Sequence, residues 1–242
     1  MIQGLYSAAS SLSAAAQQQD VVAHNLAHAT VPGYRGRGLA FSTFDPEGPT
    51  DSGSSTTPLR GTEVSREYTL FRPGDYQQTD NPLDLAVRGD GFFALEGPSG
   101  TVYTRNGCFE LNGEGQLQSK SGLLVSGSGG PISIPPGTAK ISIGQDGSVS
   151  ADGTQVGQIS VVAFQDSTQL RRVGPTLFDA PPGADSPSLQ AGVIQGYREG
   201  SNVGVIQEMV NLIAGSRYYE STAKALKALS ETLQQRTQPQ QA

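Results

Sequence analysis

Two long segments, one at each end of the chain, repeat their apolar residues at spacings of three and four. In residues 2–26 the repeat falls on Ile2, Leu5, Ala9, Leu12, Ala16, Gln19, Ala23 and Leu26. In residues 205–233 it falls on Val205, Met209, Leu212, Ser216, Tyr219, Ala223, Leu226, Ser230 and Leu233. This is the a/d spacing of a helical seam, so the pattern predicts one long helix at each terminus. We expect Ser201 or Asn202 to cap the second helix.

Both predicted seams are narrow and rich in Ala, Ser and Gln. A helix with so little apolar surface is marginal in water, because helices in proteins gain most of their stability from packing. We therefore expect the two helices to pair with each other or with copies in neighbouring chains, and to be loosely ordered in a dilute monomer. The expected assembly interface comprises Leu5, Ala9, Leu12, Ala16, Leu26, Met209, Leu212, Tyr219, Ala223 and Leu226. Two ordinary amphipathic helices on a globular core are the alternative.

Between the two helical patterns, short runs with β-branched or aromatic residues predict a β-rich region from about residue 68 to residue 198. Turn signals such as Asn112-Gly113, Asp146-Gly147 and Asp152-Gly153 separate these runs. Because no segment of helical length interrupts them, the pattern favours antiparallel hairpins over parallel βαβ units. The expected fold class is a mainly β, antiparallel, hairpin-rich middle domain flanked by N- and C-terminal α-helices that pair as a coiled-coil-like terminal domain.

The expected domain boundaries follow from these patterns. Residues 1–30 and 204–242 form the terminal helical domain, residues 31–75 a connecting segment, and residues 76–203 the outer β domain. Thr30 to Gly33 end the first helix, because the residue before Pro32 is pushed out of the α region and glycine permits positive φ. Residues 44–62 are rich in Gly, Pro, Ser and Thr and are predicted to form a mobile loop or one ordered by assembly.

Composition narrows the function classes. The 242 residues include 31 Gly and 15 Pro, which agrees with many turns, and the net charge of −6 gives no nucleic-acid footprint. No stretch approaches the ~20 apolar residues that cross a bilayer. A cleavable secretory signal is not expected, since no basic residue precedes Arg35. Cys108 is the one cysteine, and a buried thiol in a strand is the expected reading.

Candidate chemical motifs are weak in this sequence. Ser221 and Lys224 match S-x-x-K without the other motifs of serine acyl enzymes. His24 and His28 lie four apart on a helix, but an interaction with helix-end carbonyls is favoured over a metal site. Asp80, Asp84 and Asp90 could be paired carboxylates of a carbohydrate-active enzyme but are explained as turn residues. We therefore expect no catalytic residue, no cofactor and no metal, with a freestanding β-domain binding module or an enzyme as the alternatives.

Four ordered motifs carry a family resemblance. "HNLAHATVPGYRGR" (residues 24–37) resembles the signature that ends the first helix of bacterial flagellar rod and hook proteins, and it matches at Asn25, Leu26, Ala27, Thr30, Pro32, Gly33 and Tyr34. "NPLDLAVRGDGFFAL" with "YTRNGCFELNGEGQL" resembles the family's central β signature. "EGSNVGVIQEMVNLIAGSRYYE" resembles its C-terminal signature, which includes Ser201, Asn202 and Val203. His24 and His28 replace the asparagines that are more usual there.

The resemblance implies a structural subunit of the flagellar drive shaft that self-assembles axially and transmits torque. It implies partners among copies of itself and other rod subunits, and export through the flagellar type III apparatus guided by uncleaved N-terminal information. It implies a location in the basal-body rod, in the periplasmic space. Neither a nucleic-acid partner nor direct membrane insertion is expected.

Overall fold

A computed structural model describes residues 2–44, 61–98, 100–181, 183–187 and 191–237. The chain forms two compact units, each built from several separate segments. Unit 1 comprises residues 1–27, 37–69 and 204–242, and unit 2 comprises residues 28–36 and 70–203. The fold class expected from the sequence is confirmed, because an N-terminal helix, an antiparallel β-rich region and a C-terminal helix follow one another along the chain.

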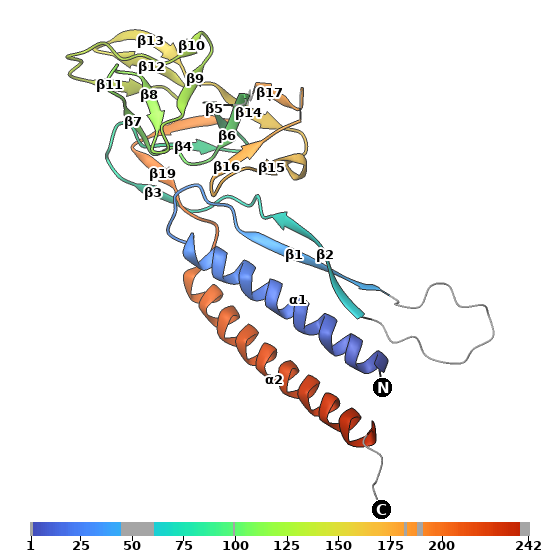
Figure 1. Ribbon diagram of the computed structural model, residues 1–242. Coiled ribbons are helices and arrows are strands. Elements are labelled where there is room, and N and C mark those ends of the chain that lie inside the picture. Colours follow the sequence, from blue (N-terminus) through green and yellow to red (C-terminus); the bar gives the residue numbers. More distant parts are fainter. Residues whose placement is uncertain (1, 45–60, 99, 182, 188–190, 238–242) are drawn as a thin grey trace, which may run out of the picture. The chain divides into compact units, whose positions relative to one another are not determined.

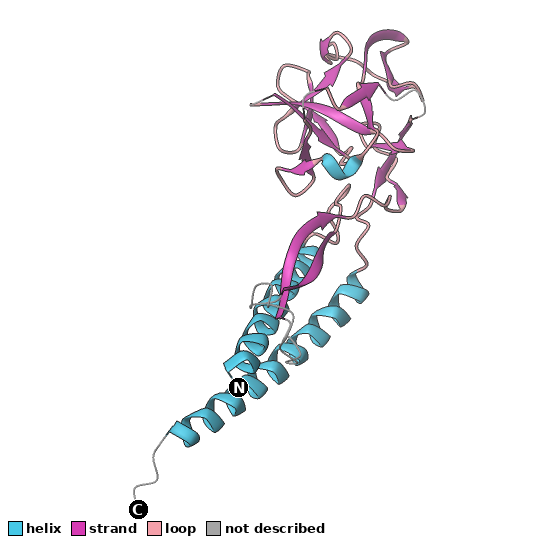
Figure 2. Cartoon of the chain, turned by 90° about the vertical axis from the view of Figure 1, so that its right-hand side faces the viewer, coloured by secondary structure: helices cyan, strands magenta, loops and turns pink. Residues whose placement is uncertain are grey.

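The described residues of unit 1 form two long helices and one β-hairpin. Helices α1 (Ile2–Ala27) and α2 (Val205–Thr237) lie side by side and run in opposite directions (Figure 1). The hairpin of β1 (Arg37–Phe44) and β2 (Gly61–Thr69) lies along α1 (Figure 2). Its backbone is fixed to α1 by the Thr62 amide, which donates to the Ser10 hydroxyl at 3.3 Å. Helix α1 therefore packs on two faces, one toward α2 and one toward the hairpin.

The hairpin differs from the expectation, because the sequence pattern predicts no strand between residues 31 and 67. The loop predicted for residues 44–62 falls mainly on residues 45–60, which lie outside the described part of the chain. Its flanking residues Phe44, Gly61 and Thr62 are strand residues.

Unit 2 is built of short antiparallel strands. Its largest sheet has the path β15-β16-β6-β5-β9-β8-β7, with β10, β14 and β17 paired alongside, and smaller sheets join β11-β12-β13, β18-β4 and β19-β3. The strands are β3 (Tyr76–Gln78), β4 (Leu85–Arg88), β5 (Phe92–Gly97), β6 (Gly100–Thr104), β7 (Phe109–Leu111), β8 (Leu117–Ser119), β9 (Leu124–Gly127), β10 (Gly130–Pro131), β11 (Ile141–Ile143), β12 (Ser148–Ala151), β13 (Thr154–Gln158), β14 (Val161–Phe164), β15 (Arg171–Arg172), β16 (Leu177–Asp179), β17 (Asp185–Pro187), β18 (Gly192–Gln195) and β19 (Tyr197–Glu199). A 3₁₀ turn, η1 (Ser167–Gln169), precedes β15.

The predicted turn at Asp152-Gly153 illustrates how the sequence sets the strand register. Ala151 pairs with Thr154 across a two-residue loop, and both loop residues have positive φ, 49° at Asp152 and 85° at Gly153. These are the dihedral signs of a type I′ turn, whose twist matches that of the flanking strands. The hairpin of β12 and β13 follows directly from this dipeptide.

Strand β5 is buried on both sides, and its residues alternate between two apolar cores. Phe93 and Leu95 belong to the larger core, while Phe92 and Ala94 belong to a second core that also contains Phe178. Successive side chains of a strand point to opposite faces of the sheet, so the continuous apolar run "FFAL" supplies both cores. Four edge-on aromatic contacts consolidate the region, and they join Phe71–Phe92, Phe92–Phe178, Phe92–Phe164 and Tyr103–Phe164.

Candidate functional site: the helix pair and the junction of the connecting segments

The chain passes between its two units four times, after Ala27, Gly36, Thr69 and Val203. These crossings lie next to the residues that carry the family resemblance at each terminus. Within unit 2, the segments that reach the crossings are 28–36, 70–75 and 199–203. We call the network that joins these three segments the junction.

Asn202 joins all three segments of the junction through its side-chain amide. Its Nδ2 donates to the carbonyl oxygens of Leu70 at 2.6 Å and Arg72 at 2.9 Å, and its Oδ1 accepts from the Gly36 amide at 2.7 Å. Its own backbone amide donates to the Tyr34 carbonyl. Each bond satisfies a backbone group that belongs to no regular ladder, which explains why an asparagine, with donors and an acceptor on one short side chain, stands here.

The capping role expected for Asn202 or Ser201 is therefore wrong. The first backbone bond of α2 runs from the Glu208 amide to the Gly204 carbonyl at 3.0 Å, so Gly204 occupies the N-cap position. Ser201 instead accepts a hydrogen bond from the Val203 amide with its hydroxyl. The Asn202 side chain is fully engaged by the junction, and this long-range use cannot be read from the local sequence.

Glu199 is the charged centre of the junction and is completely buried. Its Oε1 accepts from Arg35 Nη2 at 2.6 Å and from the Gly74 amide at 2.9 Å, and its Oε2 lies 3.4 Å from Arg105 Nη1. Arg105 also donates to the carbonyl oxygens of Val87 and Gly89. Burial lowers the pKa of the Arg105 guanidinium, and the attraction of Glu199 opposes this shift. One carboxylate thus neutralises part of the charge of two buried arginines. Without Glu199, both guanidinium groups would be buried without a compensating negative charge, which is strongly destabilising.

Gly33 and Tyr34 explain the "PGY" part of the first signature. Gly33 has φ +69°, and a Cβ there would lie 2.3 Å from the Asn106 amide nitrogen, so no side chain fits. Its amide donates to the Glu199 carbonyl at 2.8 Å. The Tyr34 ring is buried, stacks on His28 at a centroid distance of 5.0 Å, and lies under the guanidinium of Arg172 at 5.3 Å.

Asn25 makes a comparable tie in unit 1. Its Nδ2 donates to the Arg37 carbonyl at 3.0 Å and its Oδ1 accepts from the Arg37 amide at 2.9 Å. The last turns of α1 are thereby bonded to the first residue of β1. Among the remaining signature residues, Val203 is buried and packs beside Tyr34. Three others are half-buried, namely Leu26, Pro32 and Ser201, while Ala27 and Thr30 are exposed.

The predicted seam on α1 is displaced from the face that packs. The most buried side chains of this helix include Ala14, Ala15 and Val22, none of which was in the seam. Of the predicted interface residues on α1, Leu5, Leu12, Ala16 and Leu26 are half-buried and Ala9 is exposed. The buried stripe is also wider than an a/d seam, because the hairpin covers a second face of α1.

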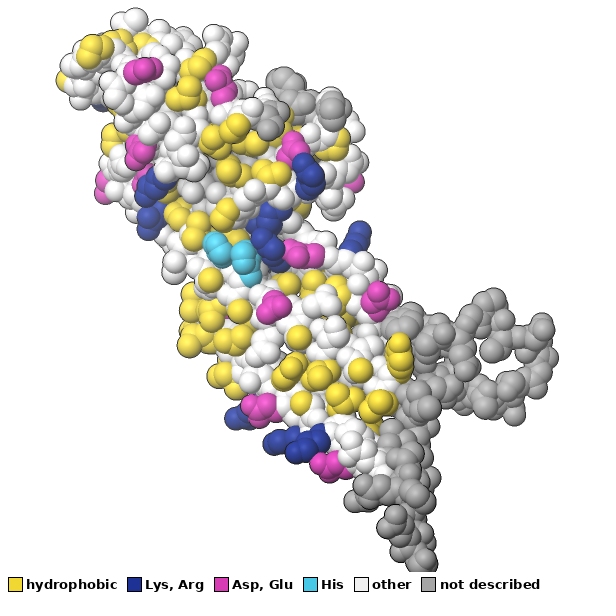
Figure 3. Space-filling model, viewed as in Figure 1, with side chains coloured by type: hydrophobic (Ala, Val, Ile, Leu, Met, Phe, Trp, Pro, Cys, Tyr) yellow, Lys and Arg dark blue, Asp and Glu magenta, His cyan; other side chains and the backbone are white. Residues whose placement is uncertain are grey.

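On α2 the half-buried positions follow the predicted spacing more closely. Leu212, Ser216, Ala223, Leu226 and Ser230 are half-buried, whereas Met209 and Tyr219 are exposed. A further set of apolar side chains on the first turns of α2 was not singled out by the sequence analysis: Ile206, Val210 and Ile213 are 79%, 55% and 56% exposed. Figure 3 shows apolar side chains gathered over this part of the helix.

Other sequence candidates acquire no site in the structure. Asp84 is buried and accepts a hydrogen bond from Asn81, which agrees with a turn role, and Ser221 donates to the Tyr218 carbonyl within α2. Cys108 is a buried free thiol, and burial raises its pKa, with the Asp84 charge adding to the effect. Among the described residues, no group of three or more His, Cys, Asp or Glu could hold a metal ion. None of the described helices combines the length and apolar character required to span a bilayer.

Comparison with protein-family models gives three matches along the chain. Residues 5–35 match "Flagella basal body rod protein", residues 86–151 match "Flagellar hook protein FlgE/F/G D1 domain", and residues 194–238 match "Flagellar basal body rod FlgEFG protein C-terminal". The first match covers residues 28–35 of the first junction segment, and the third covers all of segment 199–203.

Curated relatives agree with the family models over nearly the whole chain. A flagellar basal-body rod protein FlgG of Buchnera aphidicola is 31% identical over 265 positions, which cover 98% of this chain and 100% of the relative. A FlgF of Mesorhizobium japonicum is 32% identical over 230 positions, covering 94% and 93%. A FlgF of Caulobacter vibrioides is 33% identical over 219 positions, covering 89% and 88%.

Proposed function

Because the chain belongs to the flagellar basal-body rod protein family, we propose that it is a rod subunit of the FlgF type that is built into the rod through its terminal helices. The family is structural and not enzymatic, and its members lie in the flagellar basal body and assemble with other rod components. Beyond the family assignment, we propose that the chain is of the FlgF type, that its terminal helices form the assembly interface, and that copies of the chain assemble with one another. Export through the flagellar type III apparatus and the transmission of torque belong to the same proposal.

The lengths of the alignments favour the FlgF type. The FlgF alignments cover 94% and 89% of the 242 residues in 230 and 219 positions, so they contain few gaps, whereas the FlgG alignment needs 265 positions to cover 98%. The FlgG relative therefore contains residues that have no counterpart in this chain. This agrees with the shortness, in sequence, of the segment that follows the first helix here. The distal rod protein FlgG remains the second candidate, since its identity and coverage are nearly equal.

The single observation that carries the assembly role is the character of unit 1. A helix pair with small, half-buried contact residues and exposed Ile206, Val210 and Ile213 leaves apolar surface for further subunits. In this proposal the residues predicted from the sequence, from Leu5 to Leu226, contact α1, α2 or neighbouring copies in the rod. A heterologous contact that does not close then produces a helical array.

The subtype is tested by locating the protein along the rod. Basal bodies are isolated from cells that carry an epitope tag at the C-terminal end of the chain, and gold-labelled antibody is imaged by electron microscopy. Label at the proximal end of the rod is expected for the FlgF type. Label at the hook end would make the chain a FlgG-type subunit, and isolated basal bodies without label would refute the rod assignment.

The assembly interface is tested by placing a charge on the helix pair. Leu12→Asp and Leu226→Asp are expected to prevent incorporation into basal bodies while unit 2 keeps its near-UV circular dichroism, because a charge without a partner is costly wherever the helices pack. Gln17→Asp, at an exposed position of α1, is the matched control and is expected to assemble. Incorporation of both leucine variants at the level of the control would contradict the interface.

A further inference from the structure

The first turns of α2 are apolar on more than one side of the helix. Leu212 lies on the half-buried side, while Ile206, Val210 and Ile213 form an exposed stripe at positions i, i+4 and i+7. We call these three residues the outer ridge. Exposed apolar side chains that line up along one side of a helix mark a surface that another element or subunit covers, and the described residues of unit 1 do not cover the outer ridge.

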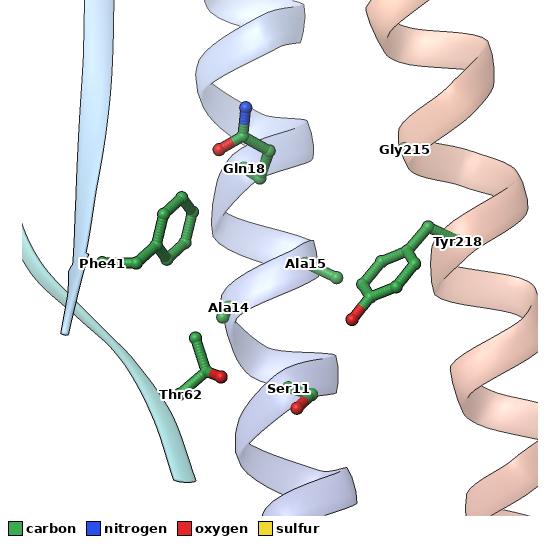
Figure 4. A pocket seen from close by; sticks show the side chains of 8 residues that line it. All are labelled: Ser11, Ala14, Ala15, Gln18, Phe41, Thr62, Gly215 and Tyr218. Carbon is green, nitrogen blue, oxygen red and sulfur yellow. The ribbon is translucent and has the colours of Figure 1, made fainter. Parts of the chain in front are cut away.

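Unit 1 also contains a hollow between its two helices and the hairpin, with a volume of about 380 Å³. We call it the helix groove. Its lining residues are Ser11, Ala14, Ala15, Gln18, Phe41, Thr62, Gly215 and Tyr218. Figure 4 shows short side chains on α1 with the aromatic rings of Phe41 and Tyr218 on opposite sides of them.

The groove and the ridge are complementary in size and in charge. Ser, Ala and Gly on the floor leave space for branched aliphatic side chains, which the two aromatic rings can flank. Among the described residues, neither the lining of the groove nor the outer ridge contains a charged side chain. An uncharged groove with small residues accepts an aliphatic helix edge without burying an unpaired charge.

The ridge and the groove point in different directions from α2. Ile213, on the ridge, and Tyr218, in the groove, are five residues apart, which places them about 140° apart around a helix of 3.6 residues per turn. One neighbour approaching along α2 therefore cannot fill the groove and cover the ridge with the same surface. Surfaces that face different directions suit two different neighbours, and this is the property of a heterologous contact that repeats along an array.

We propose that the outer ridge of one copy, Ile206, Val210 and Ile213, docks into the helix groove of a second copy of the same chain. Both halves of the contact are present in one sequence, which favours a second copy over an unrelated partner as the occupant. The proposal rests on the rod assembly proposed above and specifies the surfaces through which it occurs. Each copy gives its ridge to one neighbour and its groove to another.

Cysteine pairs placed on separate copies test the contact. One copy carries Ile213→Cys, a second carries Gln18→Cys and a different epitope tag, and both are produced in the same cells. Basal bodies that contain both tags are isolated and treated with a short bismaleimide. The expected product is a dimer with both tags, which neither variant gives alone. Cys108 is buried, and the single-variant samples control for any reaction at its thiol.

The matched control replaces Gln18 with its neighbour Gln17, which is exposed and does not line the groove. The dimer yield with Gln17→Cys is expected to be at least fivefold lower. Equal yields, or no dimer in basal bodies that contain both tags, would overturn the ridge-to-groove contact and leave rod assembly standing. If basal bodies contain neither tag, and also lack the tagged chain without any cysteine substitution, rod assembly itself would be overturned. Ile206→Cys repeats the test at a second ridge position if Ile213→Cys alone prevents incorporation.

Discussion

The most informative single substitution is Glu199→Gln, because it removes the charge at the centre of the junction and keeps the size of the side chain. Glutamine has nearly the same shape, and its Oε1 can still accept the hydrogen bond from the Gly74 amide. What is lost is the neutralisation of Arg35 and Arg105, whose guanidinium groups approach Glu199 to 2.6 and 3.4 Å, and the Oε2 acceptor of Arg105, whose place an amide NH₂ takes. The substitution therefore tests what one buried carboxylate contributes, through its charge and its second acceptor oxygen, while the shape of the side chain is kept.

The expected magnitude follows from the burial of all three groups. The side chains of Arg35, Arg105 and Glu199 are 1%, 4% and 0% exposed, so water cannot replace the lost partner. Removing one member of such a buried ion pair costs roughly 3–5 kcal/mol. With a urea slope of about 2 kcal/mol/M, the unfolding midpoint falls by roughly 2 M.

The assay is urea unfolding of the full-length chain followed by near-UV circular dichroism, because the two buried tyrosines, Tyr34 and Tyr103, both belong to unit 2 and the tyrosines of unit 1 are exposed. Asp179→Asn is the control within the same unit, because Asp179 pairs with Arg171 at 3.0 Å with side chains 41% and 77% exposed. An exposed pair of this kind contributes less than about 1 kcal/mol. If the midpoint of Glu199→Gln shifts no further than that of Asp179→Asn, the charged centre of the junction does not stabilise the fold as argued.

Three further predictions concern the junction and its surroundings. Asn202→Ala removes three side-chain hydrogen bonds and is expected to lower the unfolding free energy by about 2–3 kcal/mol, at about 1 kcal/mol each, as measured by the urea midpoint; an unchanged midpoint would contradict this. Gly33→Ala should lower the melting temperature well below that of Gly137→Ala, because both glycines have positive φ but only Gly33 would bring a Cβ within 2.3 Å of a backbone nitrogen; equal melting temperatures would refute the close approach. Burial, with the charge of Glu199, raises the pKa of the Tyr76 phenol above 10. The stability that the neutral phenol contributes is therefore complete below pH 10 and is lost as the pH rises through the higher pKa of the folded state. In an alkaline absorbance titration, the phenolate step that Tyr76→Phe removes should lie above pH 10, and a step below pH 10 would contradict this.

The regular elements of this protein were largely predictable because local signals determine them. The seams predicted both long helices, and residues such as Asp152 and Gly153 predicted their turn, since the required positive φ is a property of the dipeptide. The apolar run from Phe92 to Leu95 likewise predicted a strand, although alternation between two cores became visible only when both faces of the sheet were known. Local propensity and periodicity account for these elements without tertiary information.

The junction could not be predicted, because its bonds join residues far apart in sequence. Nothing near Glu199 indicates that its partners are Arg35 and Arg105, and Asn202 next to a helix start reads as a cap until Leu70 and Gly36 are brought beside it. The family signature marked Gly33, Tyr34 and Asn202 as a group but gave no physical reason for them. The β1–β2 hairpin was missed for a related cause, since its pairing spans residues that the composition assigned to a loop.

The junction ties also bear on how a rod subunit of this kind would transmit torque between its units. Any force that passes along the chain from unit 1 to unit 2 passes through the backbone at four crossings. Asn25 bonds the first crossing to the second within unit 1, while the Leu70 amide and Asn202 bond the second, third and fourth within unit 2. A crossing that is tied to its neighbours shares its load, whereas an untied crossing extends until its own backbone is taut. In the torque transmission proposed above, the asparagines of the two terminal signatures would hold neighbouring crossings together, a role that neither the helix seams nor the β core supplies.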